Sequence, residues 1–382
     1  MSRIQRGARY ALGRLCSFLP KQGRKAVFES FNGRGYSDSP KAIAQELLAR
    51  GGWKLYWVVK DMGEAQSLPE GVRPVVKGSL EETYHLHTAG AWVDNCRKWG
   101  HLWKRPGQYY IQTWHGFPLK RIEGDAADAL PQDYLRAARH DSQMCDLFLS
   151  NSRFLTDIYR RAFWYGGQVL EAGFPRNDIL AQPHPELGEK VRRALSLPQG
   201  KRLALYAPTF RKDKGLSAYD MDYPRCAGAL EKRFGGEWLL LAKLHPNIAE
   251  KAGGMDLDPR YIVNASDYPD IQELYLACDV LLTDYSSVMF DYLVTGKPCF
   301  LYVNDLAAYK NDRNFYYDID RLPFPRAEDN PQLEAAILGY DPQAQKQREE
   351  AFCREFGLTE SGTAAAQAAD WLEQHLRKEE TR

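Results

Sequence analysis

The chain lacks the short motifs that mark the most familiar nucleotide and hydrolase sites. None of G-x-x-x-x-G-K-[ST], G-x-G-x-x-G after a strand, or G-x-S-x-G occurs in its 382 residues. These absences argue against a P-loop, a dinucleotide fingerprint and a nucleophile elbow. No stretch approaches the roughly 18 apolar residues that a membrane-spanning helix needs, so the sequence predicts none.

Cysteine and metal-ligating patterns are equally sparse. The chain has seven cysteines without any C-x-x-C spacing, and such a scattered set indicates reduced thiols in a cytosolic protein. Cys278 and Cys299 lie in or beside apolar runs and are expected in the core. Three Asp-x-Asp pairs, which begin at Asp220, Asp256 and Asp318, follow no clear buried strand. We therefore interpret them as loop acids and expect no metal site.

Acidic residues are absent from the first 25 positions, which carry seven Arg or Lys. Because the net charge of the whole chain is +1, the remainder carries a formal −6, and this disfavours nucleic-acid binding. Apolar residues recur in this segment at helical spacing, namely Ile4, Ala8, Ala11, Leu12, Leu15, Phe18 and Leu19. A basic amphipathic helix of this kind is expected to lie on an anionic membrane surface. A helix docked on its own domain and an Arg-rich transit peptide are the alternatives.

Two series of short apolar runs, separated by helical stretches, predict the fold. The first series is Ala26–Phe31, Leu55–Val59, Val72–Val76, Ala91–Asp94, Tyr109–Trp114, Leu147–Ser150 and Val169–Ala172. The second is Leu203–Ala207, Trp238–Lys243, Tyr261–Asn264, Val280–Thr283 and Cys299–Val303. Strands that alternate with helices form parallel sheets, so the fold class is α/β. We expect a basic helix over 1–25, two doubly wound domains over 26–185 and 186–345 that face a cleft, and a helical segment over 346–382.

Two histidines follow expected strands, where ligands collect in parallel sheets. His115 stands in QTWHGFPLK, before a glycine, Gly116, that permits close approach. Lys243 and His245 stand in KLHP, in the opposite half of the chain. A strand-end histidine can act as a general base near neutral pH, or it can be a structural residue bonded to a carbonyl.

Other strand ends carry anion-binding side chains. Arg211 in YAPTFR suits bidentate phosphate binding, although a salt bridge between domains is equally compatible with it. The turn GFPRND holds Arg176 and Asn177, either as ligand contacts or as a capped turn. In TDYSS, Ser286 and Ser287 reach the expected start of a helix, which can seat a phosphate or merely cap scaffold.

Taken in order, these motifs resemble the CDP-glycerol glycerophosphotransferase family, the primases and polymerases of wall teichoic acid and related capsule polymers. The matching segments are FESFNGRGYSDSPKAIAQEL, YYIQTWHGFPLKRI, LFLSNSRF, GFPRNDIL, LYAPTFRKD, LAKLHP, LLTDYSSVMFDYLVTGKPCFLY and DRNFYYD. The resemblance implies a GT-B-like fold whose C-terminal domain holds the nucleotide and whose N-terminal domain meets the acceptor. It also implies peripheral work on the cytoplasmic face of the membrane, with a lipid-linked acceptor. The segment SGTAAAQAADWL resembles the family's closing helix only loosely, so no site is assigned there.

The resemblance further implies in-line phosphoryl transfer without a cofactor other than the donor. An acceptor hydroxyl would attack the β-phosphorus of CDP-glycerol, and CMP would leave. His115 would be the base, while His245, with Arg211 and Lys243, would stabilise the diphosphate and the departing CMP.

The remaining expected contacts hold the substrates. Ser286 and Ser287 would hold the phosphates, and Asp291 would either steady their helix or reach the ligand. The expected substrate-binding set also includes Thr283, Asp38, Ser39, Gly116, Arg176 and Asn177. A ribitol-phosphate transferase that uses CDP-ribitol, a GT-B glycosyltransferase that uses a nucleotide sugar, and an inactive scaffold at the membrane are the rival functions.

Overall fold

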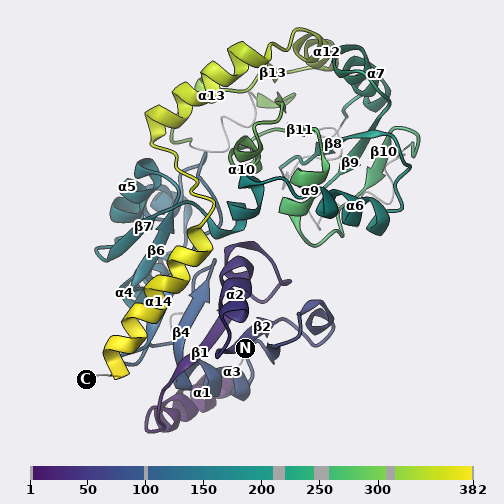
Figure 1. Cartoon of the computed structure of the whole chain (residues 1–382). Coiled ribbons are helices and arrows are strands. Elements are labelled where there is room, and N and C mark those ends of the chain that lie inside the picture. Colours follow the sequence, from purple (N-terminus) through teal and green to yellow (C-terminus); the bar gives the residue numbers. More distant parts are fainter. Residues whose placement is uncertain (1–2, 99–101, 210–219, 245–257, 307–314, 381–382) are drawn as a thin grey trace. The chain divides into compact units, whose positions relative to one another are not determined.

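The computed structural model describes residues 3–98, 102–209, 220–244, 258–306 and 315–380. The chain forms two compact units, drawn with their elements labelled in Figure 1. Unit 1 comprises residues 1–115, 122–178 and 357–382, and unit 2 comprises residues 116–121 and 179–356. Each unit is built around its own parallel sheet.

Seven parallel strands form the sheet of unit 1, in the order β3-β2-β1-β4-β5-β6-β7. They are β1 (Gln22–Glu29), β2 (Lys54–Val59), β3 (Val72–Val76), β4 (Ala89–Asp94), β5 (Tyr109–Gln112), β6 (Leu147–Ser150) and β7 (Gln168–Glu171). The strand order reverses between β1 and β4, so the loops after these two strands leave the sheet in opposite directions. Such a switch point opens a crevice at the carboxyl ends of the strands, where ligands bind.

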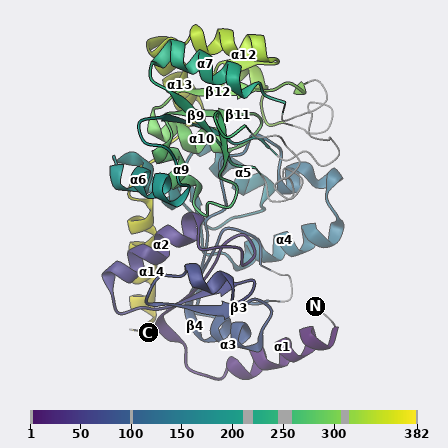
Figure 2. The same cartoon turned by 90° about the vertical axis from the view of Figure 1, so that its right-hand side faces the viewer.

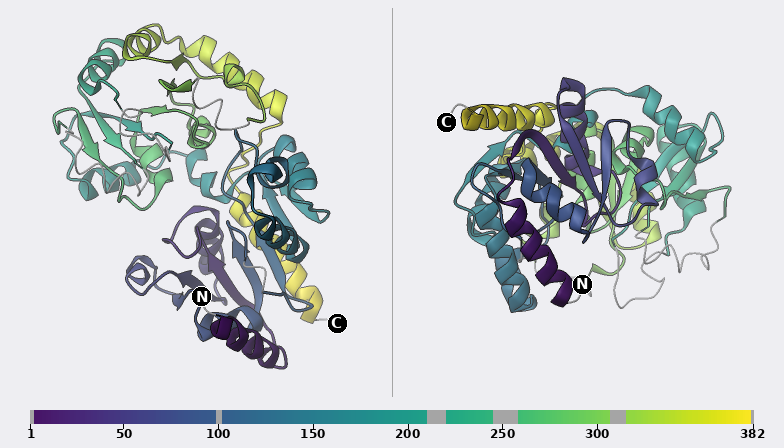
Figure 3. Two further views of the ribbon diagram at one scale, coloured as in Figure 1. Left: turned by 180° about the vertical axis from the view of Figure 1, so that it is seen from behind. Right: turned by 90° about the horizontal axis from the view of Figure 1, so that it is seen from below.

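Helices cover both faces of this sheet. They are α1 (Arg3–Cys16), α2 (Asp38–Arg50), α3 (Leu80–Thr88), α4 (Gln132–Met144), α5 (Arg153–Ala162) and α14 (Ala364–Glu380), with 3₁₀ turns η1 (Glu64–Ser67), η2 (Glu123–Ala129) and η3 (Pro175–Ala181). On one face α2 and α14 run side by side, as Figure 3 shows. Their side chains Leu47 and Leu372 are fully buried in one cluster with Phe28 and Val93 of the sheet.

Unit 2 has a six-stranded parallel sheet in the order β10-β9-β8-β11-β12-β13. The strands are β8 (Arg202–Tyr206), β9 (Trp238–Ala242), β10 (Ile262–Asn264), β11 (Val280–Thr283), β12 (Cys299–Tyr302) and β13 (Arg326–Ala327). The helices are α6 (Pro185–Ala194), α7 (Tyr223–Phe234), α9 (Ile271–Ala277), α10 (Val288–Tyr292), α12 (Asn330–Leu338) and α13 (Pro342–Phe356), with 3₁₀ turns η5 (Leu293–Thr295) and η6 (Ile319–Arg321). Its switch point lies between β8 and β11.

The expected fold class is confirmed, and each expected strand is present with ends displaced by at most a few residues. The strand β13 was not foreseen, because two residues carry no periodicity. Cys278 and Cys299 are buried as expected, and all seven cysteines are free thiols.

The two units exchange segments, unlike the contiguous domains expected over 26–185 and 186–345. Residues 116–121 belong to unit 2, where the ring of Phe117 lies 4.7 Å from that of Phe290. Residues 357–382 return to unit 1, where Leu372 is buried in its core. The segment expected over 346–382 is therefore divided, because α13 and α14 bury their apolar faces in different cores.

The N-terminal helix α1 is docked on α3, as Figure 2 shows. Its buried face is formed by Arg9, Gly13 and Cys16, and Arg9 donates to the carboxylate of Glu82 at 2.5 Å. Its outward side chains include Leu15, which is 66% exposed, and Phe18 just beyond its end, which is 86% exposed. No helix in the described part of the chain is both long and apolar enough to cross a membrane.

Candidate active site

The loops after β1 and β4 meet at the switch point of unit 1. The backbone N–H of Phe31, two residues beyond β1, donates to the side-chain oxygen Oδ1 of Asn95 at 2.8 Å. Asn95 directly follows β4 and is completely buried. This bond joins the two diverging loops at the mouth of the crevice.

His115, which follows β5, is held by the same asparagine. Its Nδ1 lies 2.8 Å from the backbone carbonyl oxygen of Asn95. Because a carbonyl oxygen only accepts hydrogen bonds, the neutral ring carries its proton on Nδ1 and leaves a lone pair on Nε2. Burial lowers the pKa of His115, so the ring is neutral near pH 7.

Aromatic rings flank the imidazole on two sides. The ring of Trp114 stacks on it with centroids 4.2 Å apart, and the ring of Phe31 lies 6.1 Å away at a tilt. Trp114 in turn packs against Phe163, with centroids 4.7 Å apart, and lies under the guanidinium of Arg97 at 5.8 Å. The histidine is therefore fixed in orientation as well as in tautomer.

Strained backbone is concentrated here. Seven non-glycine residues of the described chain have left-handed φ angles, and five of them lie in this part of unit 1. They are Phe31 (φ 44°), Asn32 (62°), Asp38 (64°), Trp114 (52°) and Glu123 (50°). Gly116 has φ 139°, which glycine adopts readily. Strain of this kind persists only where the surroundings enforce it, and it clusters at functional sites.

Asp38, Ser39 and Arg176 come together at the start of α2. Arg176 donates to the Oδ2 atom of Asp38 at 2.8 Å, and both side chains are about 95% buried. The hydroxyl of Ser39 accepts from the backbone N–H of Arg176 at 3.4 Å. Asp38 and Arg176, which were each expected to bind substrate, therefore form an ion pair with each other.

Glu360 ties the C-terminal segment to the loops after β6 and β7. Its carboxylate accepts from the side-chain amides of Asn151 and Asn177, each at 3.1 Å, and from the backbone N–H of Phe174 at 3.0 Å. Asn177 therefore belongs to a structural cluster. Sequence reasoning missed Glu360, because nothing near it in the chain indicates a partner some 200 residues away.

A buried ion cluster anchors the loop after β4. Lys98 donates to Glu29 at 2.7 Å and to Asp94 at 2.8 Å, so one lysine bridges the ends of β1 and β4. Burial alone would raise the pKa of Glu29, but Lys98 and Lys77 lower it to about 2. Burial raises the pKa of Asp94. The sequence analysis assigned no role to this loop, although it follows an expected strand just as the assigned loops do.

The switch point of unit 2 repeats the same arrangement. Thr209, beyond β8, donates from its backbone N–H at 2.9 Å and from its hydroxyl at 2.6 Å to Asp284, which directly follows β11. Thr283, expected to bind substrate, is fully buried and donates its hydroxyl to the carbonyl of Ala207 at 2.7 Å. Asp284 therefore joins the two loops as Asn95 does in unit 1.

The expected serine turn precedes a very short helix. Ser287 occupies the N-cap of α10, which has five residues, and its side chain makes no capping hydrogen bond. Ser286 instead accepts from the backbone N–H of Val288, at 3.5 Å. Asp291 is buried inside α10. Because the dipole of so short a helix is small, it contributes little to the phosphate binding that was expected at this turn.

Lys243 turns toward backbone rather than into a crevice. Its ammonium donates to the carbonyl oxygens of Ser266 and Tyr268, both at 2.6 Å. Burial lowers its pKa. The other two expected cationic contacts, Arg211 and His245, lie outside the described residues.

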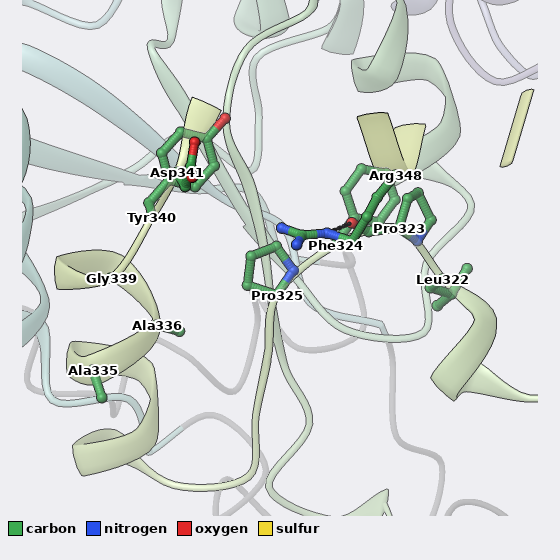
Figure 4. Close-up of a pocket in the computed structure, with 10 residues that line it drawn as sticks. All are labelled: Leu322, Pro323, Phe324, Pro325, Ala335, Ala336, Gly339, Tyr340, Asp341 and Arg348. Carbon is green, nitrogen blue, oxygen red and sulfur yellow. Dashed lines mark hydrogen bonds between the residues drawn. The ribbon is translucent and has the colours of Figure 1, made fainter. Parts of the chain in front are cut away.

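A pocket of about 320 Å³ lies at the edge of unit 2, and Figure 4 shows its lining. Leu322, Pro323, Phe324 and Arg348 lie on one side, and Tyr340 lies across from them. Arg348 donates to the carbonyl oxygen of Pro323 at 3.4 Å. Since residues 322–325 lead into β13, the pocket opens at the amino-terminal ends of the strands. Ligands of parallel sheets bind at the opposite, carboxyl edge.

Within the described ranges, no cluster of three or more His, Cys, Asp or Glu side chains could hold a metal ion. Two of the loop acids noted in the sequence accept hydrogen bonds from nearby backbone N–H groups. Asp222 accepts from the backbone N–H of Arg225 at the start of α7, and Asp318 accepts from that of Asp320.

The chain is similar to a known protein family, to named relatives and to solved structures. The family model described as CDP-Glycerol:Poly(glycerophosphate) glycerophosphotransferase matches residues 12–372. The chain is 33% identical to the teichoic acid glycerol-phosphate transferase of Staphylococcus aureus, over 93% of its own length and 94% of that protein. It is 32% identical to the teichoic acid poly(glycerol phosphate) polymerase of Staphylococcus epidermidis, of which it spans only 51%. A solved structure of the wall teichoic acid polymerase TagF with CDPG superposes with a TM-score of 0.85 at 30% identity, covering 98% of this chain and 94% of that one.

Proposed function

The chain belongs to the CDP-glycerol:poly(glycerophosphate) glycerophosphotransferase family, and we propose that it transfers glycerol phosphate from CDP-glycerol to an acceptor hydroxyl and releases CMP. The named relatives act in teichoic acid synthesis, and two of them carry glycerol phosphate in their names. The GT-B-like fold of two parallel-sheet units agrees with the TagF structure.

The observation that carries the proposal is the 2.8 Å contact between Nδ1 of His115 and the backbone carbonyl oxygen of Asn95. Because this oxygen only accepts, the proton lies on Nδ1, and Nε2 is the basic atom of a neutral ring at the carboxyl edge of the unit 1 sheet. We assign Nε2 the role of taking the proton of the acceptor hydroxyl. The hydroxyl oxygen then bonds to the β-phosphorus, the bond from this phosphorus to the bridging oxygen breaks, and CMP leaves with the electron pair.

The donor is assigned to unit 2. Its switch point between β8 and β11 supports this assignment, since nucleotides bind at such points in doubly wound sheets. We propose that Ser286 and Ser287 face the phosphates and that His245 and Arg211 stabilise the departing CMP. Lys243 shapes the loop that contains Ser266 through its two carbonyl contacts.

Membrane contact is assigned to the outward face of α1 and the residues just after it. Leu15, Phe18 and Leu19 are exposed there, near Arg14 and Lys21, a combination that suits anionic lipid. A lipid-linked acceptor and a peripheral position on the cytoplasmic face would follow. The double substitution Leu15→Ser with Phe18→Ser should lower binding to phosphatidylglycerol vesicles, whereas Leu338→Ser, which removes an exposed leucine of α12, should not.

A donor panel tests the reaction. The purified chain is incubated with a glycerol-phosphate-primed lipid acceptor and with CDP-glycerol, CDP-ribitol or a UDP-sugar, and the released nucleotide is measured. We expect CMP from CDP-glycerol, with product mass increased by one or more glycerol phosphates. Preferential use of CDP-ribitol or release of UDP would overturn the donor assignment.

A further inference from the structure

The loop after β4 contacts the candidate base directly, and its first residue, Asn95, has no assigned role. Asn95 makes two contacts in different directions. Its backbone carbonyl accepts from His115, and its side-chain Oδ1 accepts from the backbone N–H of Phe31. Its hydrogen bonds therefore join the histidine to the loop after β1.

We propose that Asn95 is the positioning residue of this site: its backbone carbonyl fixes the tautomer of His115, and its side chain holds the ring of Phe31 beside the imidazole to receive the carbon–hydrogen face of a polyol or sugar acceptor. The inference rests on the proposed function, because it assigns the acceptor to the site of His115. It adds a residue and a recognition surface that the proposed reaction does not require by itself.

The orientation of the Asn95 amide supports this role. A backbone N–H only donates, so Oδ1 must face Phe31 and the amide nitrogen Nδ2 must point elsewhere. Nδ2 is buried and has no hydrogen-bond partner among the described residues. A buried unpaired donor is unfavourable, and such groups in native proteins call for a functional explanation.

The backbone of Phe31 supports it as well. Phe31 has φ 44° and the next residue, Asn32, has φ 62°, a conformation that bulky side chains avoid. The bond from Phe31 to Asn95 is one of the contacts that enforce this conformation. As a result Phe31 is 38% exposed, and the centroid of its ring lies 6.1 Å from that of the imidazole.

An exposed phenyl ring beside a base suits a particular acceptor chemistry. The carbon–hydrogen face of a polyol or sugar packs on an aromatic ring, and its hydroxyl is then directed to the neighbouring base. Placing the hydroxyl in this way contributes to the rate through orientation rather than through affinity for the donor.

Ion pairs of the residues that follow Asn95 hold its backbone in place. Lys98 is bound to both Glu29 and Asp94, and Arg97 donates to Asp141 at 3.0 Å. These contacts hold Arg97 and Lys98, which closely follow Asn95, without touching His115. Because alanine at position 95 keeps the backbone carbonyl, loss of the Asn95 side chain is expected to act on Phe31 rather than on the tautomer of His115 or on the whole unit.

The test compares Asn95→Ala with a matched control in the full-length protein. Gln108→Ala is the control, because Gln108 is a buried amide before β5 that donates to the carbonyls of Leu86 and Ala89 and does not contact the site. We expect Asn95→Ala to lower kcat about 10- to 100-fold with little change in KM for CDP-glycerol, because misplacing a reacting group costs about that much. Gln108→Ala should leave kcat unchanged even where it lowers the unfolding temperature.

The ¹⁵N spectrum of His115 and the pH profile of kcat/KM give two further readouts of the role of Asn95. In ¹⁵N spectra of histidine-labelled protein, assigned with His115→Ala, the wild type should show a protonated Nδ1 and an unprotonated Nε2. Asn95→Ala should keep this pattern, because the backbone carbonyl remains. Asn95→Asp, which also keeps the acceptor for Phe31, should keep it too and raise the pH of the acid limb of kcat/KM. An unchanged kcat in Asn95→Ala, or a wild-type spectrum without a protonated Nδ1, overturns the proposal.

The spectra also separate this proposal from the proposed function. If the wild type releases no CMP from CDP-glycerol, the reaction assignment fails, but the wild-type spectrum still reports whether the carbonyl of Asn95 fixes the tautomer of His115. If the wild type is active and Asn95→Ala keeps the wild-type kcat, the role of Asn95 alone is rejected.

Discussion

The Nδ1 atom of His115 lies 2.8 Å from the backbone carbonyl oxygen of Asn95, and this contact decides which ring nitrogen can act as a base. The carbonyl accepts the Nδ1 proton and Nε2 remains basic. Comparable support appears in unit 2, where Asp284 accepts from Thr209 across the other switch point. One polar side chain directly after a central strand thus ties the two loops together in each unit.

The pH dependence of the reaction should report the state of His115. Burial lowers its pKa below the ordinary value of about 6.5, so the neutral, basic form persists to lower pH than in a free histidine. We expect kcat/KM to be constant near pH 7 and to fall only as pH drops through this lowered pKa. A limb centred above about 6.5 in the pH profile of kcat/KM would contradict the assignment.

The buried ion pair of Asp38 and Arg176 should matter for stability. Arg176→Met leaves the carboxylate of Asp38 buried without its partner, and loss of one member of a buried pair costs about 3–5 kcal/mol. Urea denaturation should show this loss of unfolding free energy. Arg136→Met, which breaks an exposed pair with Asp133, serves as the control and should change stability little.

Glu360 should hold the C-terminal segment on unit 1. Glu360→Gln replaces one acceptor oxygen by an amide that faces existing donors, including Asn177 and the N–H of Phe174, so we expect a loss of about 1–3 kcal/mol. The free energy of unfolding measures it. Glu350→Gln alters only an exposed pair with Arg354 on α13, and an equal loss in that variant would speak against a specific role.

The docking of α1 depends on a glycine. A Cβ atom at Gly13 would lie 2.7 Å from the ring of Trp103 and 2.8 Å from Nε2 of His87. Gly13→Val should therefore loosen α1, lowering the unfolding free energy by about 1–3 kcal/mol and exposing the helix to protease. Gly7→Ala is the matched control, since nothing lies within 4 Å of its Cβ position, and it should be neutral or slightly stabilising.

Most strands were predictable from the sequence because they are buried, apolar or β-branched runs, whereas the two-residue strand β13 was not. Val280–Thr283 and Leu147–Ser150 are fully buried and were placed with their observed ends. The exchange of residues 116–121 and 357–382 between the units was not predictable, because it depends on which core accepts Phe117 and Leu372. Local periodicity shows that a side chain is buried but does not show where.

The candidate site was predicted only in its most conspicuous members. A histidine after a strand attracts notice, and His115 stands where such a base is expected. Asn95 carries no local signal that separates it from any other asparagine, because its role comes from two partners 64 and 20 residues away. Asp38 and Arg176, assigned separately to substrate, neutralise each other across 138 residues. Pairings at this separation follow from the tertiary structure alone.

The most direct test of the central claim measures CMP release from CDP-glycerol, with a primed lipid acceptor, by wild-type protein and His115→Ala. Removal of a general base lowers a rate by about 10²–10⁴-fold, and we expect a fall of this size with an unfolding temperature close to that of the wild type. CMP release by the folded variant at the wild-type rate would contradict the assignment of His115 as the base.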